Sequence, residues 1–293
     1  MNATRHRPDE MLVEVASLFN LLGGMAPRHL ALIGGLVPPL LVPAPAPHHR
    51  GSADIDLTLS VAITTGETAL YYRSLEKRLE PFFEPFEADF RWKKREGVPG
   101  LPLLVDFMGP EIEATQVADG TLRLEAETAA SNVGSTLRPL PLKAAGVVDV
   151  DAVTRLVEGV SLVYEPGVRA DVEIRHTGPV GFLASKADAF ATRSDAKDGY
   201  DVSWWCIHAA PDPDVVARLV TERDAFRNEY FQESVALLMR AFRAPDYPGP
   251  SGFANEENRG ADPSDAAFAE ARNLAYAAVS PVLDRLRDAL WVE

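Results

Sequence analysis

The sequence predicts an α/β (α+β) protein, with a mixed sheet and its helices in the N-terminal half and a helical domain after it. The first half of the chain alternates short apolar runs with stretches of helical spacing, as expected when strands and helices alternate. After Pro179, almost every stretch has helical spacing. The 293 residues are 46% hydrophobic and 25% charged, which is typical of a globular chain with a sizeable core. We therefore expect two domains, residues 1–178 and residues 179–293.

The N-terminal half has signals for three helical segments and four strands. Pro8–Leu22 has apolar residues at helical spacing and is closed by Gly23 and Gly24. Leu101–Met108 is a nearly continuous apolar run, which fits a buried strand. The proline-rich stretch Val42–Pro47 favours extended structure in a surface loop. The remaining predictions are strands over His29–Ile33, Asp54–Val61 and Phe86–Trp92, a short helical segment over Leu36–Val42 and a helix over Glu67–Phe82.

The middle of the chain is less regular, and the C-terminal half is helical. Between residues 110 and 175, the predicted elements are strands over 122–126, 137–142 and 172–175 and a helix over 149–159. Residues 244–262 are rich in Pro, Gly and Asn, which predicts a mobile loop. Helices are predicted over residues 181–193, 198–209, 213–220, 224–242 and 264–290.

Composition and charge exclude several classes of protein. No apolar run is long enough for a transmembrane helix, and the N-terminus has no signal-peptide core, so we expect a cytoplasmic protein without membrane contact. The single cysteine, Cys206, excludes an intramolecular disulfide and a cysteine-cluster metal site, and we expect a buried, inert thiol. The net charge of −14 argues against a broad electrostatic surface for nucleic acid, although a local basic groove stays open.

Two aspartates, Asp54 and Asp56, begin the strand that follows the proline-rich stretch. Residues two apart in a strand point to the same face, so these carboxylates project side by side, with Ile55 and Leu57 on the opposite face. Adjacent carboxylates repel each other unless a cation lies between them, and Mg²⁺ prefers such oxygen ligands. Taken alone, the pair is more often a polar turn at the start of a strand.

Three further features favour a metal and phosphate site. Asp106 lies inside a buried apolar run, where an unpaired carboxylate costs several kcal/mol. Either it is hydrogen-bonded at the end of its strand, or it lies on an adjacent strand and completes a three-carboxylate site for two magnesium ions. The Gly34-Gly35 turn lets backbone N–H groups approach a phosphate. Arg50 and Ser52 precede the aspartate pair at alternate positions, where a guanidinium and a hydroxyl suit a triphosphate.

A Gly-Gly turn, an Asp-x-Asp pair and a later strand aspartate together resemble the polymerase-beta-like nucleotidyltransferase superfamily. Residues 186–201 contain Lys-x-x-Ala-x-x-x-Arg-x-x-x-Lys-Asp-x-x-Asp, which is similar to the final motif of the AbiEii/AbiGii-type toxin nucleotidyltransferases. That family also has Arg-x-Thr/Ser-x-Asp-x-Asp after a Gly-Gly turn. The resemblance spans about residues 28–210. Two departures are the long proline-rich loop before Asp54 and the serine at position 52 in place of the commoner threonine.

The resemblance implies roles for the residues of the first block. Asp54 and Asp56 would bind Mg²⁺, and Asp106 would be either a third metal ligand or the base for the attacking hydroxyl. The triphosphate would be held by Gly34, Gly35, Arg50 and Ser52.

The second block would supply cations. Lys186 would contact the nucleotide phosphates, and Asp198 or Asp201 would orient that lysine or the substrate. Lys186 and Arg193 are seven residues apart, so one face of the helix carries both cations. Without the first block, such a face is most often a solvated network of ion pairs. The active cleft would lie between the two domains, with Lys186 facing the carboxylates.

The resemblance implies a magnesium-dependent nucleotidyltransferase that moves a nucleoside monophosphate from a nucleoside triphosphate to a hydroxyl acceptor. The toxin relatives suggest a tRNA or another RNA as acceptor, and an antitoxin protein as partner. A small-molecule acceptor, as in antibiotic-modifying nucleotidyltransferases, stays open, as does a non-catalytic module that binds nucleotide or antitoxin. One local basic cluster that could meet RNA consists of Arg91, Lys93, Lys94 and Arg95.

Four aromatic side chains near these blocks are interpreted as structural. His48 and His49 lie in the loop before the aspartate pair and are predicted to be exposed, although either could touch a phosphate or a base. Trp204 and Trp205 lie in an apolar helix, where packing is a better explanation than base stacking.

Overall fold

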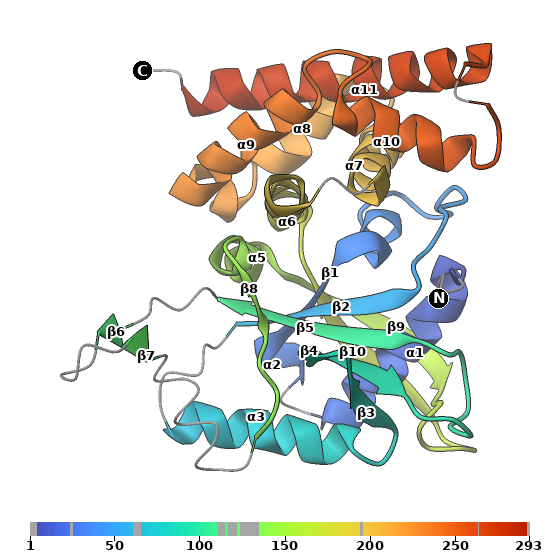
Figure 1. Cartoon of the computed structure of the whole chain (residues 1–293), viewed down its shortest axis with the longest axis vertical. Coiled ribbons are helices and arrows are strands. Elements are labelled where there is room, and N and C mark those ends of the chain that lie inside the picture. Colours follow the sequence, from blue (N-terminus) through green and yellow to red (C-terminus); the bar gives the residue numbers. More distant parts are fainter. Residues whose placement is uncertain are drawn as a thin grey trace. The chain divides into compact units, whose positions relative to one another are not determined.

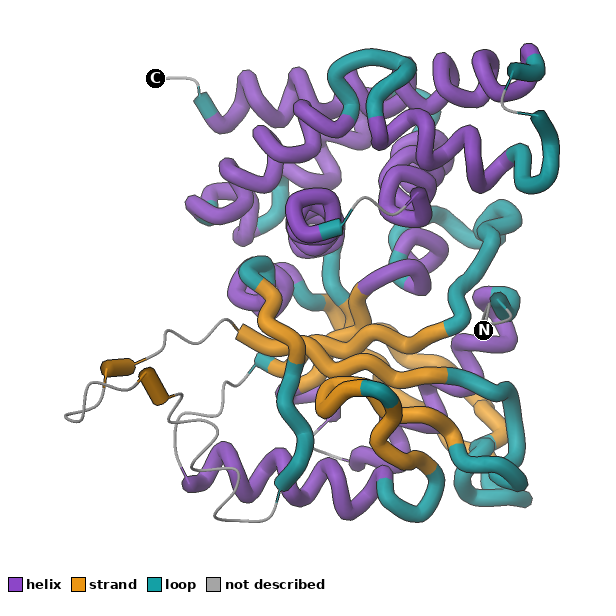
Figure 2. The backbone as a smooth tube through the Cα atoms, viewed as in Figure 1, coloured by secondary structure: helices purple, strands orange, loops and turns teal. Residues whose placement is uncertain are grey.

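A computed structural model describes residues 5–23, 26–60, 66–110, 115–116, 122–123, 135–193, 196–262 and 264–291 (Figures 1 and 2). The chain divides into two compact units. The first, which we call the sheet unit, consists of Met1–Ile33, Arg50–Gly146 and Val153–His176. The second, the helical unit, consists of Gly34–His49, Val147–Ala152 and Thr177–Glu293. The proline-rich stretch therefore belongs to the helical unit, although strands of the sheet unit flank it in sequence.

The sheet unit contains a mixed sheet with eight strands in the described part of the chain. Seven strands follow the order β3-β4-β5-β2-β1-β10-β9, and β8 pairs with β5. The pairs β2–β5, β1–β10 and β5–β8 are parallel, and the other pairs are antiparallel. The strands are β1 (Leu30–Ile33), β2 (Asp54–Leu59), β3 (Phe83–Phe86), β4 (Ala88–Lys94), β5 (Leu104–Pro110), β8 (Leu140–Leu142), β9 (Val153–Ser161) and β10 (Arg169–His176), and a separate pair is formed by β6 (Thr115–Gln116) and β7 (Leu122–Arg123).

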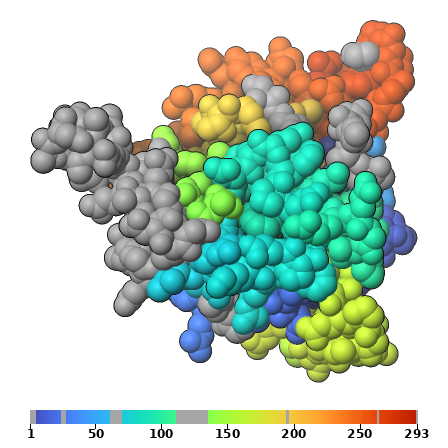
Figure 3. Space-filling model, turned by 60° about the horizontal axis from the view of Figure 1, so that its bottom comes forward, coloured from blue at the N-terminus to red at the C-terminus, as the bar shows by residue number. Residues whose placement is uncertain are grey.

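Helices of the sheet unit cover its sheet. Helix α1 (Pro8–Leu22) packs against β9 and β10. It buries one apolar face, which includes Met11, Val15 and Leu18, as the helical spacing predicts. Figure 3 shows one face of this unit, where α3 (Gly66–Leu79), β3 and β4 lie in cyan and teal. The short helix α2 (Ala26–His29) precedes β1.

The helical unit is built around glycine-mediated contacts between helices α7 (Ala196–Ala209) and α10 (Pro248–Glu257). A Cβ atom on Gly199 would lie 2.3 Å from the Gly249 carbonyl oxygen, so the two helices approach backbone to backbone. Tyr200 and Trp204 pack beside this crossing in one buried cluster with residues of α10 and α11. The other elements are η2 (Gly34–Leu36), η3 (Pro38–Leu40), α6 (Pro179–Thr192), α8 (Pro213–Thr221), η4 (Asp224–Arg227), α9 (Glu229–Ala241) and α11 (Ala266–Leu290), and α5 (Ala145–Asp151) crosses the division between the units in sequence.

The mixed-sheet prediction with a helical C-terminal region is confirmed, but two elements were predicted wrongly. The helix predicted over 149–159 is the end of α5 followed by strand β9, whose β-branched residues pair with β10. The loop predicted over 244–262 contains α10, in which Pro248 occupies the first turn and Gly249 and Gly252 lie in close contacts.

Other predicted boundaries shift by a few residues. The strand predicted over 86–92 is the β3–β4 hairpin, and the one over 101–108 begins at Leu104. Gly24, Val61 and residues 124–126, which belong to predicted elements, lie outside the described residues. Within the part of the chain that the structure describes, no helix is both long and apolar enough to cross a bilayer.

Candidate active site

Strands β2 and β5 bring three carboxylates together. Asp54 and Asp56 occupy the first and third positions of β2, which runs parallel to β5 with Asp56 directly opposite Asp106. One carboxylate oxygen from each residue lies within 4.8 Å of the others. The sequence prediction that Asp106 lies on a strand adjacent to the aspartate pair is confirmed.

Burial follows the alternation of β2. Ile55 and Leu57 are fully buried in the core, while Asp54 and Asp56 are half-buried on the opposite face. Asp106 is 4% exposed, so its charge is largely removed from water. Such a carboxylate needs a compensating cation or hydrogen-bond donors.

Arg91 supplies that compensation within the sheet unit. It lies on β4, opposite Asp106 in the antiparallel pair β4–β5. Its Nε donates to Asp106 Oδ1 at 2.8 Å and its Nη2 donates to Asp106 Oδ2 at 2.7 Å, which is a bidentate contact. These hydrogen bonds raise the pKa of the Arg91 guanidinium above its ordinary value, so it stays charged. The two hydrogen bonds from Arg91 therefore occupy both oxygens of the Asp106 carboxylate.

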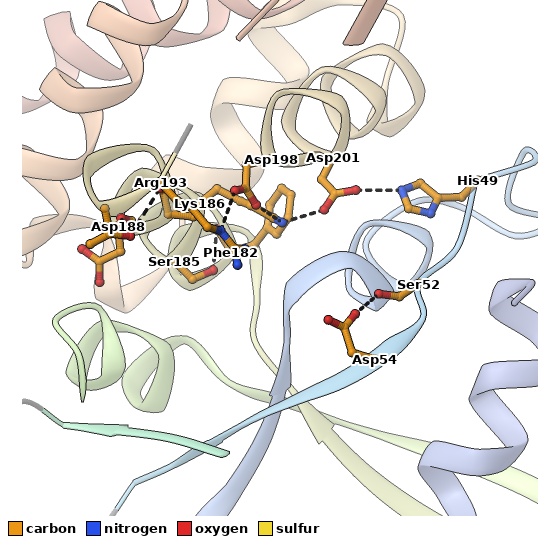
Figure 4. A network of polar contacts seen from close by, with 12 residues as sticks. His49, Ser52, Asp54, Phe182, Ser185, Lys186, Asp188, Arg193, Asp198 and Asp201 are labelled. Atoms are coloured by element: carbon orange, nitrogen blue, oxygen red, sulfur yellow. Dashed lines mark hydrogen bonds and ion pairs between the residues drawn. The ribbon is translucent and has the colours of Figure 1, made fainter. Parts of the chain in front are cut away.

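Ser52 forms a hydrogen bond with Asp54, the first carboxylate of the cluster. It is fully buried, and its Oγ donates to Asp54 Oδ1 at 2.5 Å (Figure 4). Gly51 precedes it with a φ of 70°, and a Cβ there would lie 1.8 Å from the His6 carbonyl oxygen. Glycine is therefore required at this turn. Arg50 is half-buried at the start of the same segment.

These residues fit a divalent metal ion. The cluster offers only oxygen ligands from carboxylates, which is the donor set that Mg²⁺ prefers. The mutual repulsion of three carboxylates at this separation is a reason for the fold to favour a bound cation. When bound, a divalent ion at such a site stabilises developing charge on a phosphoryl group and its leaving group.

Lys186 is the centre of a buried network in the helical unit (Figure 4). It extends from α6 and is 3% exposed, and its Nζ lies 2.8 Å from Asp198 Oδ1 and 2.6 Å from Asp201 Oδ2, both on α7. Arg193, just after α6, places its Nε 3.2 Å from Asp198 Oδ2. The two cations that the sequence placed on one helix face therefore share Asp198.

Opposing influences set the charge states in this network. Burial alone would lower the pKa of the Lys186 ammonium, but Asp198 and Asp201 outweigh it and raise that pKa. Burial would also raise the pKa of the Asp201 carboxyl, but the attraction of Lys186 and the neighbouring His49 holds it well below its ordinary value. Both partners are consequently charged at neutral pH.

The Gly-Gly turn follows β1 directly and is tight, as the sequence predicts. Gly34 has a φ of 75°, in the region that glycine favours, and begins the three-residue 3₁₀ helix η2. No longer helix starts there, so the turn lacks the dipole of a full helix N-terminus. Gly35 lies next to the second block, because a Cβ on it would be 2.9 Å from Lys197 Cε and 3.4 Å from Asp201 Oδ2.

Comparison with known proteins adds the decisive observation. The family model for the nucleotidyl transferase AbiEii toxin of type IV toxin–antitoxin systems matches residues 27–279. The chain belongs to this AbiEii family. No curated protein sequence matches it significantly.

The AbiEii match includes both groups of candidate residues, from the Gly-Gly turn to Asp201. It supports a toxin-like nucleotidyltransferase. The three carboxylates belong to the sheet unit, whereas Lys186, Arg193, Asp198 and Asp201 belong to the helical unit. The cleft predicted between the domains, and the individual roles of these residues, stay predictions.

Two residues of this AbiEii chain, His49 and Arg91, contact candidate site residues in a way that the sequence did not predict. His49 was predicted to be exposed, but it is 1% exposed, with Nε2 3.2 Å from Asp201 Oδ1 and its ring centroid 4.8 Å from that of Trp204. His48, by contrast, is exposed, and its carbonyl oxygen accepts from Trp204 Nε1. Arg91 was read only as part of a basic cluster. No local pattern marks either residue, because each partner is distant in sequence.

Most of the predicted basic cluster is engaged within the sheet unit. Lys94 is buried, with its Nζ 2.8 Å from Glu14 Oε2. Arg95 donates to the carbonyl oxygens of Glu80 and Phe83. With Arg91 bound to Asp106, three of its four members have partners inside the fold.

The interpretations of Trp204, Trp205 and Cys206 as buried side chains are confirmed. Trp204 and Trp205 are both buried and pack with other aromatic rings. Cys206 is buried, and burial raises the pKa of its thiol to about 12, so it stays protonated and unreactive at neutral pH.

Proposed function

We propose that this AbiEii-family chain is a magnesium-dependent nucleotidyltransferase, which moves a nucleoside monophosphate from a nucleoside triphosphate to a hydroxyl acceptor. The observation that carries the proposal is the three-carboxylate cluster on β2 and β5. The family match supports the reaction class, and the ligand chemistry supports magnesium.

The proposed reaction forms a bond between the acceptor oxygen and the α-phosphorus. The bond from the α-phosphorus to the oxygen that bridges to the β-phosphorus breaks, and pyrophosphate leaves. The acceptor hydroxyl loses its proton to a base. Asp54 and Asp56 would hold Mg²⁺, and Asp106 would either complete the metal site or accept this proton. Mg²⁺ bound there would neutralise charge on the phosphates and make the hydroxyl easier to deprotonate.

Residues around the carboxylates would bind the triphosphate. Ser52 would keep Asp54 in place through its hydrogen bond, and Arg50 with the Gly34-Gly35 turn would contact phosphate oxygens. Lys186 would contact the nucleotide phosphates, with Asp198 and Asp201 fixing its position. Its raised pKa keeps it positively charged, which suits a phosphate ligand.

The acceptor proposed first is an RNA hydroxyl, such as the end of a tRNA, with an antitoxin protein as the regulating partner. The type IV toxin–antitoxin family supports this choice. A small-molecule acceptor is the second candidate. It is favoured by the net charge of −14 and by the internal partners of Arg91, Lys94 and Arg95, which leave less positive charge for RNA phosphates.

The test is a transfer assay with the Asp54→Asn, Asp56→Asn double variant. The full chain is incubated with Mg²⁺, each labelled triphosphate in turn and total cell extract. The double variant should lose at least about a thousandfold in transfer rate, because two metal ligands each contribute several kcal/mol to the transition state. It should remain folded, since removing two repelling charges does not disturb the core.

A charge-matched control removes two carboxylates elsewhere. Asp89 on β4 and Asp224 in η4 are exposed, so Asp89→Asn with Asp224→Asn should retain wild-type transfer. The position of the label then separates the acceptors: label in RNA supports the first candidate and label in small molecules the second. Unchanged transfer by the Asp54→Asn, Asp56→Asn variant would refute the catalytic assignment.

A further inference from the structure

We propose that Arg91 is a built-in counter-cation of the carboxylate cluster, which competes with the divalent metal for Asp106 and so sets the metal affinity of the site. This inference rests on the metal site of the proposed function. It adds a positioning residue to that site, because Arg91 acts on the metal through Asp106.

The first support is the geometry of the contact. Antiparallel pairing of β4 with β5 places Arg91 directly opposite Asp106. The guanidinium binds both oxygens, at 2.8 Å and 2.7 Å. A metal ion would need a lone pair on one of these same oxygens. Metal binding at Asp106 must therefore weaken or rearrange this bidentate contact.

The second support is the charge of the cluster. Asp54, Asp56 and Asp106 together carry three negative charges within a few ångströms. Arg91 reduces the sum to two, which a single divalent ion then balances. Arg91 is also attracted by Asp54, so it responds to the whole cluster rather than to one carboxylate. Without the guanidinium, the cluster would attract a cation more strongly but would repel itself more strongly when empty.

The third support is the position of Arg91 at the edge of the cluster. Its side chain is 28% exposed, whereas that of Asp106 is 6% exposed. The guanidinium can therefore move toward water when a metal ion takes its place beside the buried Asp106 carboxylate. Arg91 Nη1 also lies 3.7 Å from Glu87 Oε2, but the Glu87 side chain is 64% exposed, so this is a weak surface pair. Asp106 is thus the contact that holds Arg91 in place.

The experiment measures Mg²⁺ binding by titration calorimetry, and thermal unfolding with and without Mg²⁺, on the full chain. Arg91→Gln removes the charge and the bidentate contact. It should bind Mg²⁺ at least about tenfold more tightly than the wild type at low ionic strength. Its metal-free form should unfold at a lower temperature, and Mg²⁺ should raise its Tm by more than it raises the wild-type Tm.

Two variants separate charge from other effects. Arg91→Lys keeps the charge without the bidentate geometry, so its Mg²⁺ affinity should stay close to that of the wild type. Arg155→Gln removes an exposed arginine from strand β9 of the same unit and should leave Mg²⁺ binding unchanged.

The outcomes distinguish this inference from the proposed function. If Arg91→Gln binds Mg²⁺ as tightly as the wild type does, or more weakly, the proposed competition between Arg91 and Mg²⁺ is refuted. This holds even if the Asp54→Asn, Asp56→Asn variant no longer binds Mg²⁺. Absence of Mg²⁺ binding by every variant would overturn both the inference and the metal assignment. Transfer that survives in the Asp54→Asn, Asp56→Asn variant would refute the proposed function, whatever Arg91→Gln does to binding.

Discussion

The side chain of Lys186 shows how this protein keeps charges inside a fold. An ammonium that is 3% exposed is stable only if its charge and its hydrogen bonds are satisfied. Asp198 and Asp201 provide both, and Arg193 beside Asp198 balances the second of these two negative charges. His49 contacts Asp201 from the proline-rich segment. Each change at these positions therefore alters stability as well as any contact with nucleotide.

Asp201→Asn should make the protein less stable and less sensitive to acid. The pKa of Asp201 is lowered in the folded state. Its contribution to the unfolding free energy is therefore fully present above the unfolded-state pKa of about 3.9, and it is lost as the pH falls through the folded-state pKa. At pH 7 the variant should lose about 3 kcal/mol of unfolding free energy, the low end for breaking a buried ion pair, because Asp198 remains. Urea unfolding at pH 7 and pH 3 measures both quantities.

Asp246→Asn is the control for this measurement, since Asp246 is exposed. It should match the wild type at both pH values. For Asp201→Asn, the difference between pH 7 and pH 3 should be smaller than in the wild type. If the difference in unfolding free energy between the two pH values is the same as in the wild type, Asp201 does not contribute to the acid dependence of stability as proposed.

The crossing of α7 and α10 determines where the partners of Lys186 lie. Gly199 is on α7 between Asp198 and Asp201, and Gly252 on α10 meets the Ala196 carbonyl in the same way that Gly199 meets Gly249. Close backbone contact leaves no room for a side chain at either glycine. Helix α7, which carries Asp198 and Asp201, is therefore held in place by backbone packing that tolerates only glycine.

Gly199→Ala should destabilise the protein by about 1–3 kcal/mol, because the new methyl group would meet the Gly249 carbonyl oxygen at 2.3 Å. Urea unfolding at neutral pH is the measurement. The control is Gly146→Ala on α5, where an added Cβ meets nothing within 4 Å and the residue is exposed. That variant should be neutral or slightly more stable. Equal stability of the two variants would show that the helices adjust to a side chain at this crossing.

The sequence predicted an element correctly where its apolar residues followed a single spacing, either strand alternation or helical spacing. Alternation placed Asp54 and Asp56 on one face of β2, and helical spacing placed α1, α6 and α7. It failed for α10, whose prolines and glycines resemble a loop but serve the first turn and the helix crossing. It also failed for β9, where a short helix and a strand follow one another without a clear break.

The sequence predicted those parts of the candidate site whose residues lie within one segment of the chain, but not the contacts that Arg91 and His49 make with other segments. The aspartate pair and the lysine block each lie within one stretch of sequence. The contact of Arg91 with Asp106 depends on the register of β4 against β5, and β4 also pairs with β3 in a hairpin that is irregular at Pro85 and Phe86. The burial of His49 depends on Asp201 and Trp204, more than one hundred residues away. Such contacts follow from tertiary structure and leave no local signature.

At the scale of the whole molecule, the candidate residues are divided between two compact units. The carboxylates belong to the sheet unit and Lys186 to the helical unit. The AbiEii family match covers residues 27–279 and therefore includes most of both units. One nucleotide that contacts both groups, as we propose, would make its binding depend on the two units together.

Hydrogen exchange in the presence of a nucleoside triphosphate tests this dependence. The full chain is mixed with Mg²⁺ and each of four triphosphates whose α–β bridge resists cleavage. The cognate one should slow exchange in β2 and β5 of the sheet unit and also in α6 and α7 of the helical unit. At a ligand concentration of about one hundred times Kd, protection can reach about a hundredfold. The Asp54→Asn, Asp56→Asn variant should lose protection in both units, because the metal would no longer anchor the phosphates. Protection confined to one unit would instead show that the carboxylates and Lys186 serve separate ligands.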